Sequence, residues 1–525
     1  MGIYLNPGNE MFMEASRSEI YVDKTLLLKY TNSLLCTREK YLAVSRPRRF
    51  GKTTTLDMLA AYYGSSCESR ELFASFQIAK EDTFEANLGK YHVIQLDMKE
   101  FVSQTSSVDE MLSMISKEVM YDFEEEFPDV RFREPSSLLR SIKDVYAKKR
   151  APFVFLIDEW DAVFRVDNIK NNESEQRKYL DFLRNMLKDK PYVALAYMTG
   201  ILPVKKYGEH SALNMFAEYS MTEAIPISEY TGFTEKEVQG LCEEYGINYQ
   251  DMQSWYDGYL VDGFEIYNPR SVVQACMKKA FQNYWTKTET YEALKVYIDM
   301  NIDGLRDKVI RMIASEHVPV NTLKFSNDMV TFRSADDVLT LLIHLGYLTY
   351  DSEKKECYIP NREVQQEFIN SIEDGGWEEI MKAIRMSDEL LTATLSKDAG
   401  QVEEMMEQVH QSETSIMAYN NENALSSVIT IAYYTARRDY DLARELPGGK
   451  GFADVSFIPR RSSSLPAMIV ELKVDKAADA AIDQIKRKEY VEGLKGYSGK
   501  VVLAGITYDR KTKKHHCQIE EIVKE

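Results

Sequence analysis

The run Gly51-Lys52-Thr53 follows an apolar stretch at 40–45 and precedes a segment with helical spacing. In this order the glycine lets the backbone approach a phosphate, the lysine neutralises phosphate charge, and the hydroxyl can hold Mg²⁺. The start of the following helix adds its amides and the positive end of its dipole. The full phosphate-loop pattern has a further glycine five residues before Gly51, where this chain has Arg46. The sequence therefore predicts a phosphate-binding loop with an altered entry.

Two carboxylates and a hydroxyl follow later apolar stretches. Asp158 and Glu159 end the stretch at 152–159, and Thr199 lies near the end of the stretch at 192–200. We expect Asp158 to help hold the magnesium and Glu159 to orient and activate an attacking water. Thr199 is placed to sense the terminal phosphate. The phosphate and magnesium site is predicted to comprise Gly51, Lys52, Thr53, Thr54, Asp158 and Thr199.

The altered entry of the loop raises a steric question. Arg46 is followed by the rigid ring of Pro47, and both restrict a turn that glycine would permit. One interpretation is a more open loop in which Arg48 or Arg49 supplies the phosphate contacts. The alternative is that both arginines pair with acidic residues at the surface. Whether ATP is hydrolysed or only bound is left open by the sequence.

A second constellation lies in the last quarter of the chain. Asp454 lies in an alternating stretch at 451–459, and Glu471 and Lys473 lie in a more apolar stretch at 466–475. Alternate residues of a strand share a face, so Glu471 and Lys473 point the same way. A hairpin of this length can bring Asp454 opposite them. Two facing carboxylates favour Mg²⁺ or Mn²⁺, and Lys473 can orient a water or stabilise charge on a phosphate. The alternative for Glu471 and Lys473 is a surface ion pair.

The elements that must position the first constellation are short apolar strands. Strand-sized stretches at 40–45, 91–98, 152–159 and 192–200 alternate with segments of helical length. This alternation is typical of a parallel sheet covered by helices on both faces. Open sheets of this kind bind ligands at the carboxyl ends of their strands. The run Gly51-Lys52-Thr53 and the residues Asp158, Glu159 and Thr199 all fall at such strand ends.

Several longer motifs in this region resemble a known family. They are YVDKTLLL (21–28), SRPRRFGKT (45–53), FLIDEWDAVF (155–164), MTGILPVKK (198–206) and WYDGYLVDGFEIYNPRSVV (255–273). Together they resemble the bacterial AAA-ATPase-like family, which is often fused to a C-terminal nuclease domain of the PD-(D/E)XK type. The loop of that family typically reads R-P-R-R-F-G-K-[ST], so the resemblance implies that Arg46 is a family feature. It also implies ATP as the cofactor.

The middle of the chain, residues 220–370, is predicted to be mainly helical. The pattern around 335–369 favours a helix ending at Gly346, a hairpin around SEKK (352–355) and a second helix. That order resembles a winged helix, for which we prefer a role as a lid on the ATPase core over contact with DNA. The acidic, Met-rich segment 371–410 is interpreted as a helical connector.

The C-terminal segment is predicted to form a helix from about Asn421, two strands, a second helix and a further strand at 500–509. This order, with the residues above, resembles the PD-(D/E)XK nuclease family. The resemblance places Asp454, Glu471 and Lys473 on the core motif, Glu422 on the acidic helical position that adds a metal ligand, and Gln484 on a further catalytic position. Ala453 replaces the proline of the family motif.

Composition sets further bounds. The 525 residues carry a net charge of −18 and six scattered cysteines without a C-x-x-C pair, so neither a zinc site nor a disulfide framework is indicated. No secretory signal and no bilayer-length apolar run is visible, which leads us to expect a cytoplasmic protein without membrane association. Residues 446–525 are locally basic, with 15 Lys and Arg against 11 Asp and Glu. The basic runs KRK (486–488) and RKTKK (510–514) could grip a phosphate backbone, or the second could be a solvated turn.

The sequence predicts an α/β protein with a P-loop sheet domain at 1–220 and a helical, winged-helix-like region at 221–370. A connector at 371–414 and a restriction-endonuclease-like α/β domain at 415–525 follow. The favoured function is an ATP-binding, ATP-hydrolysing protein fused to a Mg²⁺-dependent phosphodiesterase that acts on nucleic acid, DNA more than RNA. The alternative is a nucleotide-gated switch, or a partner- or DNA-binding ATPase, without nuclease activity. Oligomerisation is left open.

Overall fold

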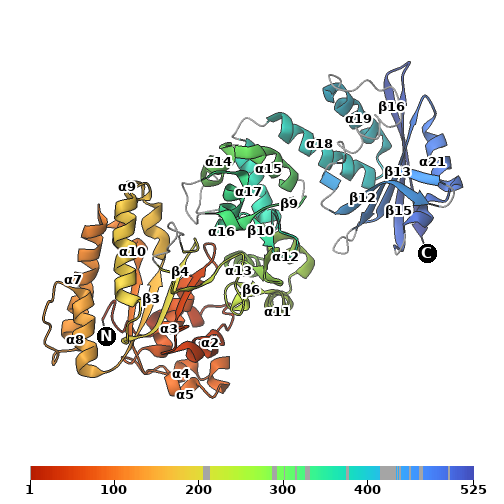
Figure 1. Cartoon of the computed structure of the whole chain (residues 1–525). Coiled ribbons are helices and arrows are strands. Elements are labelled where there is room, and N and C mark those ends of the chain that lie inside the picture. Colours follow the sequence, from red (N-terminus) through yellow and green to blue (C-terminus); the bar gives the residue numbers. More distant parts are fainter. Residues whose placement is uncertain are drawn as a thin grey trace. The chain divides into compact units, whose positions relative to one another are not determined.

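The computed structural model describes residues 2–204, 213–285, 292–300, 302–313, 316–325, 332–373, 378–413, 433, 435–436, 439–448, 451–459, 465–494 and 497–524. The chain separates into two compact units (Figure 1). The first consists of residues 1–293, 300–305 and 318–367, and the second of residues 294–299, 306–317 and 368–525. The prediction of an α/β protein is confirmed in both units.

A parallel sheet organises the first unit, in the order β2-β3-β4-β1-β5. Its strands are β1 (Tyr41–Ser45), β2 (His92–Asp97), β3 (Phe153–Asp158), β4 (Val193–Gly200) and β5 (Ala217–Tyr219). The first four are the predicted strands, and their parallel pairing is confirmed. The short β5, which pairs with β1, was not predicted from the sequence.

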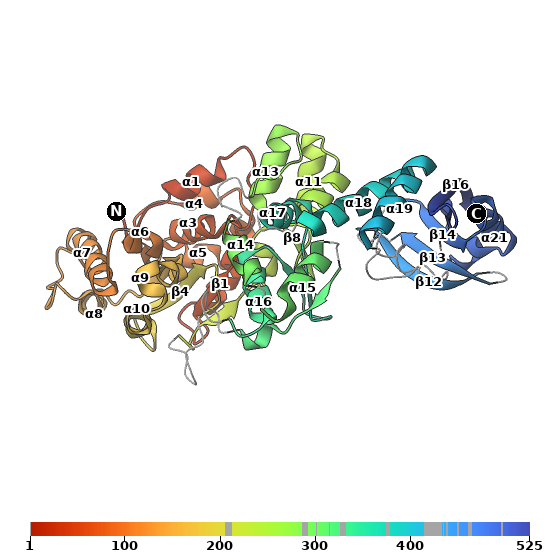
Figure 2. The ribbon, with the colours of Figure 1, turned by 90° about the horizontal axis from the view of Figure 1, so that it is seen from above.

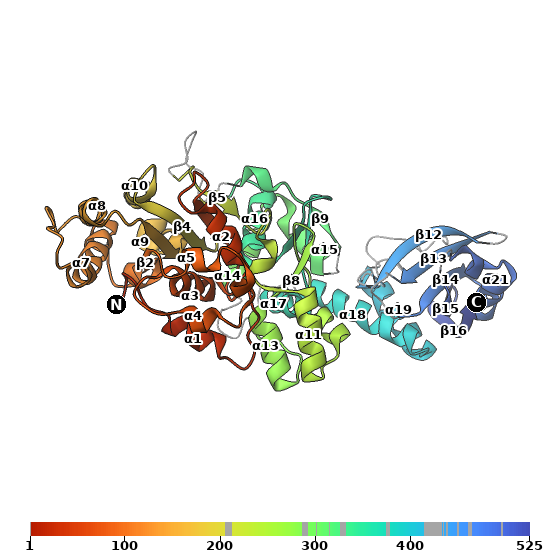
Figure 3. The ribbon, with the colours of Figure 1, turned by 90° about the horizontal axis from the view of Figure 1, so that it is seen from below.

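Helices cover both faces of this sheet. Phe153, Phe155 and Ile157 of β3 pack in one cluster with buried side chains of α7 (Val108–Glu126), α8 (Leu138–Lys149) and α10 (Glu173–Leu187). The opposite face carries α3 (Lys52–Tyr63), which contacts β2, β3 and β4 (Figures 2 and 3). Because both faces are covered, every residue of β1, β3 and β4 is buried, as expected for a parallel sheet.

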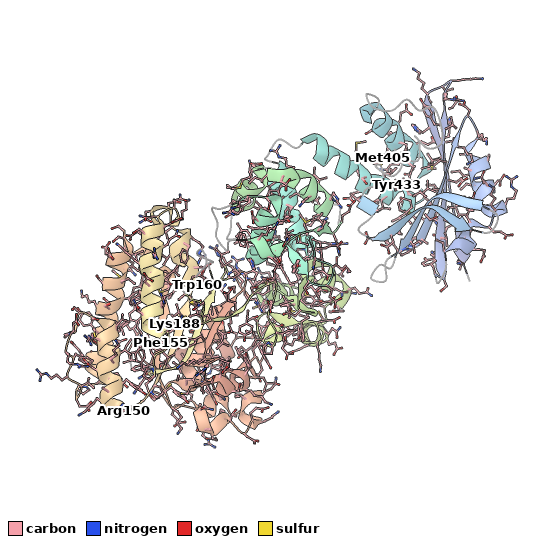
Figure 4. The ribbon with its side chains drawn as sticks, in the orientation of Figure 1. Arg150, Phe155, Trp160, Lys188, Met405 and Tyr433 are labelled. Carbon is pink, nitrogen blue, oxygen red and sulfur yellow. The ribbon has the colours of Figure 1, made fainter. Side chains whose placement is uncertain are left out.

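The remaining elements around this sheet are short. They are α1 (Glu10–Ser16), α2 (Leu27–Leu34), α4 (Arg70–Phe73), η1 (Gln77–Lys80), α5 (Phe84–Asn87), α6 (Met98–Ser103), η2 (Trp160–Arg165) and α9 (Asp167–Lys170). Trp160, labelled in Figure 4, is buried directly after β3 and packs against Gly200 at the end of β4. A Cβ at Gly200 would lie 2.6 Å from the Trp160 ring, so only glycine fits there.

The part of the first unit that follows β5 is here called the lid region, after the role predicted for it from the sequence. Its elements up to α13 are η3 (Ser228–Tyr230), β6 (Phe233–Thr234), α11 (Glu235–Tyr245), α12 (Tyr249–Tyr256), β7 (Tyr259–Val261), β8 (Phe264–Tyr267) and α13 (Pro269–Lys278). α11 begins with a capping box of Thr234 and Glu237 and ends at Gly246 in the left-handed conformation. The strands β6, β8 and β7 form a small antiparallel sheet.

A helix–hairpin–helix follows, as predicted. Its elements are β9 (Val318–Pro319), η5 (Thr322–Lys324), α16 (Ala335–Leu345), β10 (Thr349–Asp351), β11 (Glu356–Tyr358) and α17 (Arg362–Glu373). Ala335 and the whole run 337–344 of α16 are buried. A helix without an exposed face cannot enter a DNA groove, so the packing of α16 argues against DNA contact by this helix, and the lid role stays a prediction.

The second unit contains a mixed sheet in the order β12-β13-β14-β15-β16. Its elements are α14 (Glu292–Asp299), α15 (Leu305–Ile313), α18 (Glu378–Leu395), α19 (Ala399–Glu413), β12 (Tyr440–Gly448), β13 (Gly451–Pro459), β14 (Ala467–Val474), α21 (Ala478–Arg487), η7 (Tyr490–Gly493), β15 (Gly499–Asp509) and β16 (Lys514–Lys524). Between α14 and α15 in the sequence, η4 (Ile302–Gly304) belongs to the first unit. β14 pairs antiparallel with β13 and parallel with β15.

Two clusters of side chains cover the two faces of this sheet. Met405 and Tyr433, labelled in Figure 4, pack with Val470 and Leu472 of β14 on one face. Ile469 of β14 packs with residues of α21 on the other face. Glu471 and Lys473 alternate with Val470 and Leu472, which places them on the α21 face. Nowhere in the described part of the chain is a helix both long and apolar enough to cross a membrane.

Candidate functional site

The predicted phosphate loop connects β1 to α3 at the carboxyl end of the sheet. Gly51 caps α3 with φ 83°, a left-handed conformation that glycine adopts without steric cost. A Cβ on Gly51 would meet nothing within 4 Å, so backbone conformation rather than crowding requires glycine here. The loop therefore delivers Lys52 and Thr53 to the first turn of α3.

Lys52 lies at the centre of the loop. Its Nζ donates to the carbonyl oxygens of Arg46 and Pro47, each at 3.1 Å, and lies 3.8 Å from Oε1 of Glu159. Burial lowers the pKa of Lys52, while the carboxylates of Glu159 and Asp158 oppose that shift. The Lys52 ammonium could exchange these carbonyl contacts for contacts with a phosphate through a change in side-chain conformation.

Three of the predicted site residues form one hydrogen-bonded group. Thr53 Oγ1 donates to Oδ2 of Asp158 at 2.7 Å, and Thr199 Oγ1 donates to Oδ1 of the same carboxylate. The hydroxyl and the carboxylate are the hard oxygen ligands that Mg²⁺ prefers. They come from two elements that the sequence separates by 105 residues, so this donor set fits the magnesium ion of a nucleotide complex.

Glu159 follows β3 in a left-handed conformation, with φ 48°. Its carboxylate accepts a hydrogen bond from Arg165, a residue that the sequence interpretation did not single out. Burial raises the pKa of Glu159, but Lys52 and Arg165 outweigh it and hold the pKa below its ordinary value. An ionised carboxylate in this position can accept a proton or a hydrogen bond from water.

Arg46 answers the question raised by the missing glycine. Its side chain is buried and donates from Nε to Thr231 Oγ1 at 2.8 Å, and from one terminal nitrogen to the carbonyl oxygens of Ser45 at 2.8 Å and Tyr219 at 3.2 Å. Burial lowers the pKa of Arg46 to about 10. Arg46 thus fastens the loop to β5 and to the start of the lid region.

The next residues of the loop also contact the lid. The backbone of Gly346 lies against the Pro47 ring, since a Cβ there would come within 2.7 Å of it. One terminal nitrogen of Arg49 donates to the carbonyl oxygens of Tyr284, at 3.3 Å, and Trp285. The Phe50 ring packs edge-on against Tyr259 at 5.3 Å between centroids. The run before Gly51 therefore forms a contact surface for the lid.

Arg48 and Arg49 were predicted to contact phosphate or to pair with surface carboxylates. Arg48 has an exposed side chain and lines the cavity described next. Partial desolvation of its guanidinium, and the nearby charge of Arg165, lower the pKa of Arg48. Arg49 is half-buried and binds the carbonyl oxygens named above. Their role at a phosphate remains a prediction.

A cavity of about 810 Å³ opens in front of the loop, within the range of small-molecule sites. Lys52, Thr53 and Thr54 line it on the loop side, and Arg270 from the first turn of α13 also reaches it. Apolar and aromatic residues also line it, including Ile20, Tyr21, Phe233 and Val273, together with further charged residues such as Lys24 and Lys99. A lining that combines cations with apolar surface suits a nucleotide.

The second constellation lies on β14. Glu471 and Lys473 are both buried, and Lys473 Nζ donates to Glu471 Oε1 at 2.9 Å and to the Leu472 carbonyl oxygen at 2.8 Å. Gln484 Nε2 donates to the same Glu471 oxygen and, at 3.2 Å, to the Tyr490 hydroxyl. Three of the predicted catalytic residues are therefore in contact, and burial of the pair excludes the surface ion pair.

Asp454 and Glu422 complete the predicted metal site only in part. β13 pairs with β14 through Val455 and Val470, so the backbone of Asp454 comes next to that of Glu471. The side chain of Asp454 and all of Glu422 lie outside the described residues. Among the described residues, no three His, Cys, Asp or Glu side chains gather closely enough to hold a metal. Glu471 supplies one hard oxygen donor, which fits a divalent cation once Asp454 adds a second.

The basic runs have different surroundings. Lys486, from the first run, pairs with Glu520 of β16. The second run forms the turn between β15 and β16, where Arg510 pairs with Asp475. A turn of this kind corresponds to the solvated alternative for the run at 510–514.

Several residues of these sites could not be recognised from motif spacing. Arg165 lies six residues after Glu159, and only its ion pair with that residue reveals it. Asp161 is fully buried and accepts from the amides of Ile201 and Leu202 at 3.3 and 3.1 Å, which orders the turn after Thr199. Tyr490 lies six residues after Gln484 and accepts a hydrogen bond from it, and the sequence interpretation assigned it no role.

The fold is that of a P-loop-type parallel sheet domain followed by a nuclease-like mixed sheet domain. Residues 10–208 match the family model described as predicted AAA-ATPase, and residues 420–517 match that of the PD-(D/E)XK nuclease superfamily. The resemblance drawn from the sequence is therefore confirmed for both segments. One chain thus carries a segment similar to the ATPase family and a segment similar to the nuclease superfamily.

Individual relatives add less. A protein of Azotobacter chroococcum mcd 1, described as an uncharacterized protein in the vnfD 5′ region, is 27% identical over 281 residues, which is 51% of this chain and 51% of that protein. The chain thus matches about half the length of this curated relative. The Walker-type ATPase of Pyrococcus abyssi is 12% identical with a TM-score of 0.36, covering 67% of this chain and 97% of that one. The ORC2 protein of Aeropyrum pernix, solved as ADPNP–ADP complexes, is 11% identical with a TM-score of 0.31, covering 68% and 97%.

Proposed function

We propose that the first unit binds ATP with Mg²⁺ in the 810 Å³ cavity and hydrolyses it. The observation that carries this proposal is the hydrogen-bonded group of Thr53, Asp158 and Thr199 beside Lys52. Lys52 would neutralise the terminal phosphates, and the amides at the start of α3 would bind their oxygens. Thr53 and Asp158 would hold the magnesium, which when bound neutralises charge on the phosphates.

Glu159 would orient the water that attacks the terminal phosphate. Its lowered pKa keeps the carboxylate ionised at neutral pH, as a hydrogen-bond acceptor for water requires. Arg165 fixes the direction of this carboxylate through its ion pair. Thr199 would reach the terminal phosphate from the end of β4.

Calorimetry with MgATP at pH 8 tests the nucleotide site. We expect the wild type to bind and Lys52→Ala to lose at least tenfold in affinity, about 1.4 kcal/mol, because the charged contact to phosphate is gone. Lys29→Ala is the control, since Lys29 is exposed and pairs with Glu81. A wild type that does not bind MgATP would refute the proposal.

For the second unit we propose a metal-dependent phosphodiesterase activity on nucleic acid, DNA more than RNA. The contact of Glu471, Lys473 and Gln484 on adjacent elements supports it. Glu471 and Asp454, with Glu422, would hold Mg²⁺ or Mn²⁺, which when bound polarises the scissile phosphate and lowers the pKa of a water. Lys473 would stabilise negative charge on the phosphate, and Gln484 would fix the Glu471 carboxylate.

Cleavage assays on plasmid, single-stranded DNA and RNA, each with Mg²⁺ or Mn²⁺ and with or without ATP, test this activity. We expect Glu471→Gln to abolish cleavage and Glu520→Gln to preserve it, because Glu520 is a partly exposed carboxylate of β16 that pairs with Lys486. Cleavage that both variants retain would show a contaminating nuclease and refute the proposal.

A second candidate function has one observation in its favour. The Glu471 side chain is fully buried, as in an ion pair that only stabilises a fold. In this alternative the nuclease-like fold binds a partner or DNA, and ATP controls that binding without cleavage. ATP-dependent assembly or DNA binding in a protein that cuts no substrate would support it.

A further inference from the structure

The segment 283–285, here called the bridge segment, lies between the phosphate loop and α17. Its carbonyl oxygens at Tyr284 and Trp285 accept hydrogen bonds from the Arg49 guanidinium. Its amides at the same two residues donate to Oε1 of Glu363, at 2.6 and 2.8 Å. The backbone groups of Tyr284 and Trp285 therefore connect the cation of the loop with a carboxylate of α17, and the peptide group that joins these two residues contacts both.

Glu363 is built into the lid as a buried acceptor. Its side chain is 2% exposed, and both carboxylate oxygens also accept from the Ser271 hydroxyl, at 3.0 and 2.8 Å. Ser271 lies in the first turn of α13, next to Arg270, which lines the cavity. One carboxylate thus orders the bridge segment and the start of α13 together.

The loop depends on an anchored Arg49. Arg49 has φ 68°, a left-handed conformation that costs a side-chain-bearing residue free energy. Such a conformation persists only where the surroundings hold it. The bonds from the guanidinium to the bridge segment supply this support two residues before Gly51.

We propose that Glu363 is a positioning residue of the nucleotide site. Through the peptide groups of Tyr284 and Trp285 it holds the Arg49 guanidinium, and with it the loop conformation that receives the phosphates. Glu363 itself does not reach the cavity. The inference deepens the proposed nucleotide-binding function and rests on it.

The charge of Glu363 makes the effect dependent on pH. Burial raises the pKa of Glu363 to about 7, against the lowering effect of its hydrogen bonds from Tyr284, Ser271 and Trp285. The ionisable groups that face it are Arg49, Tyr256, Tyr259 and Glu367. The tyrosines stay neutral near pH 7 because burial raises their pKa values. Protonation converts the acceptor into a partial donor, which weakens its hold on both amides.

The test measures dissociation constants of MgADP for the full chain between pH 6 and pH 8.5. We expect Glu363→Gln to weaken binding about tenfold at pH 8, the effect of one charge-assisted hydrogen bond. At pH 6 the two proteins should bind alike, because Glu363 is then protonated in the wild type. Titration of the nucleotide itself cancels in the ratio of the two constants.

Glu367→Gln is the matched control. Glu367 lies one turn further along α17 and accepts from Asn283 Nδ2 at 2.5 Å, whereas Glu363 accepts from the backbone amides of the bridge segment. Because the Glu367 carboxylate raises the pKa of Glu363, we expect Glu367→Gln to retain the pH dependence of MgADP affinity, with its midpoint moved to lower pH. A constant ratio for Glu363→Gln in a protein that binds MgADP would overturn the inference alone. No binding by the wild type at any pH would overturn the proposed function and this inference together.

Ser271→Ala keeps the inference testable where Glu363→Gln fails to fold. It leaves the carboxylate in place and removes one hydrogen bond that lowers its pKa. The midpoint of the pH dependence of MgADP affinity should therefore move to higher pH. An unmoved midpoint would assign the pH dependence to another group and overturn the role of Glu363.

Discussion

Replacing Arg46 with glycine restores the standard phosphate-loop pattern. We nevertheless expect the variant to be less stable than the wild type and to bind MgATP more weakly. In the standard loop the first glycine serves a tight turn. Here the Arg46 side chain instead donates to Thr231, Ser45 and Tyr219 inside the unit. Arg46→Gly removes these bonds and leaves a cavity where a long side chain was buried.

The size of the effect follows from the contacts. Each buried acceptor that loses its donor costs about 1–3 kcal/mol, and three acceptors are affected. Removing the buried Arg46 cation returns part of this cost, because burial opposes its charge. We expect a net loss of about 3–5 kcal/mol in the free energy of unfolding, at the upper end for single substitutions.

Urea unfolding followed by tryptophan fluorescence measures this loss. Three of the four tryptophans, Trp160, Trp255 and Trp285, lie in the first unit, so the signal reports mainly on that unit. Arg48→Gly is the control, because it makes the same change at an exposed position of the same loop. The greater flexibility of glycine in the unfolded chain is then common to both variants.

The outcome that would refute this reasoning is specific. An Arg46→Gly protein as stable as Arg48→Gly, with a MgATP affinity equal to or above that of the wild type, would mean that Arg46 merely replaces glycine in the loop. A destabilised variant would show that the arginine supports the fold. Nucleotide affinity would then fall through disorder of the loop.

Three further outcomes are expected. Gly258→Ala should lower the free energy of unfolding of the first unit by more than about 3 kcal/mol, because φ is +98° and the new Cβ would clash with the backbone carbonyl oxygen of Pro360. Gly263→Ala is the comparison: φ is +83° but no atom lies within 4 Å of the new Cβ, so it should cost only about 1–2 kcal/mol in urea unfolding. Burial raises the pKa of Asp257 to about 7, so the native state binds its proton more tightly than the unfolded state, and stability should fall as pH rises from about 4 to 7. Asp257→Asn should remove this contribution to the free energy of unfolding, which is a few kcal/mol at most, at about 1.4 kcal/mol per pKa unit. If the melting temperature from calorimetry kept the same dependence on pH in the variant, the prediction would be wrong. Chelation by EDTA should abolish nucleic-acid cleavage and excess Mn²⁺ should restore it on gels, whereas cleavage that persists in EDTA would exclude the proposed metal chemistry.

Periodicity was sufficient for much of the fold. The strands β1 to β4 were predicted because buried parallel strands are short, apolar and bounded by polar turns. The helix–hairpin–helix at 335–373 was predicted because Gly346 and the charged turn mark its boundaries. β5, with exposed residues and a length of three, carries no such pattern and was missed.

The sites were predictable as far as local motifs reach. Glu471 and Lys473 share a face because of strand alternation alone, and the contact with Gln484 agrees with the family resemblance. Long-range partners were not predictable. The contact between Arg46 and Thr231 joins residues 185 positions apart, and no property of either residue in the sequence indicates the other.

The contacts of the loop with the lid also bear on how such sequences vary. Positions 46, 47 and 50 each contact a residue of the lid region that lies more than 150 positions away, at Thr231, Gly346 and Tyr259. A change on one side of such a contact alters the space or the acceptor on the other side. Among related chains the residue types at these paired positions should therefore covary. Chains that share the motif before Gly51 should also share the lid-region residues that contact it.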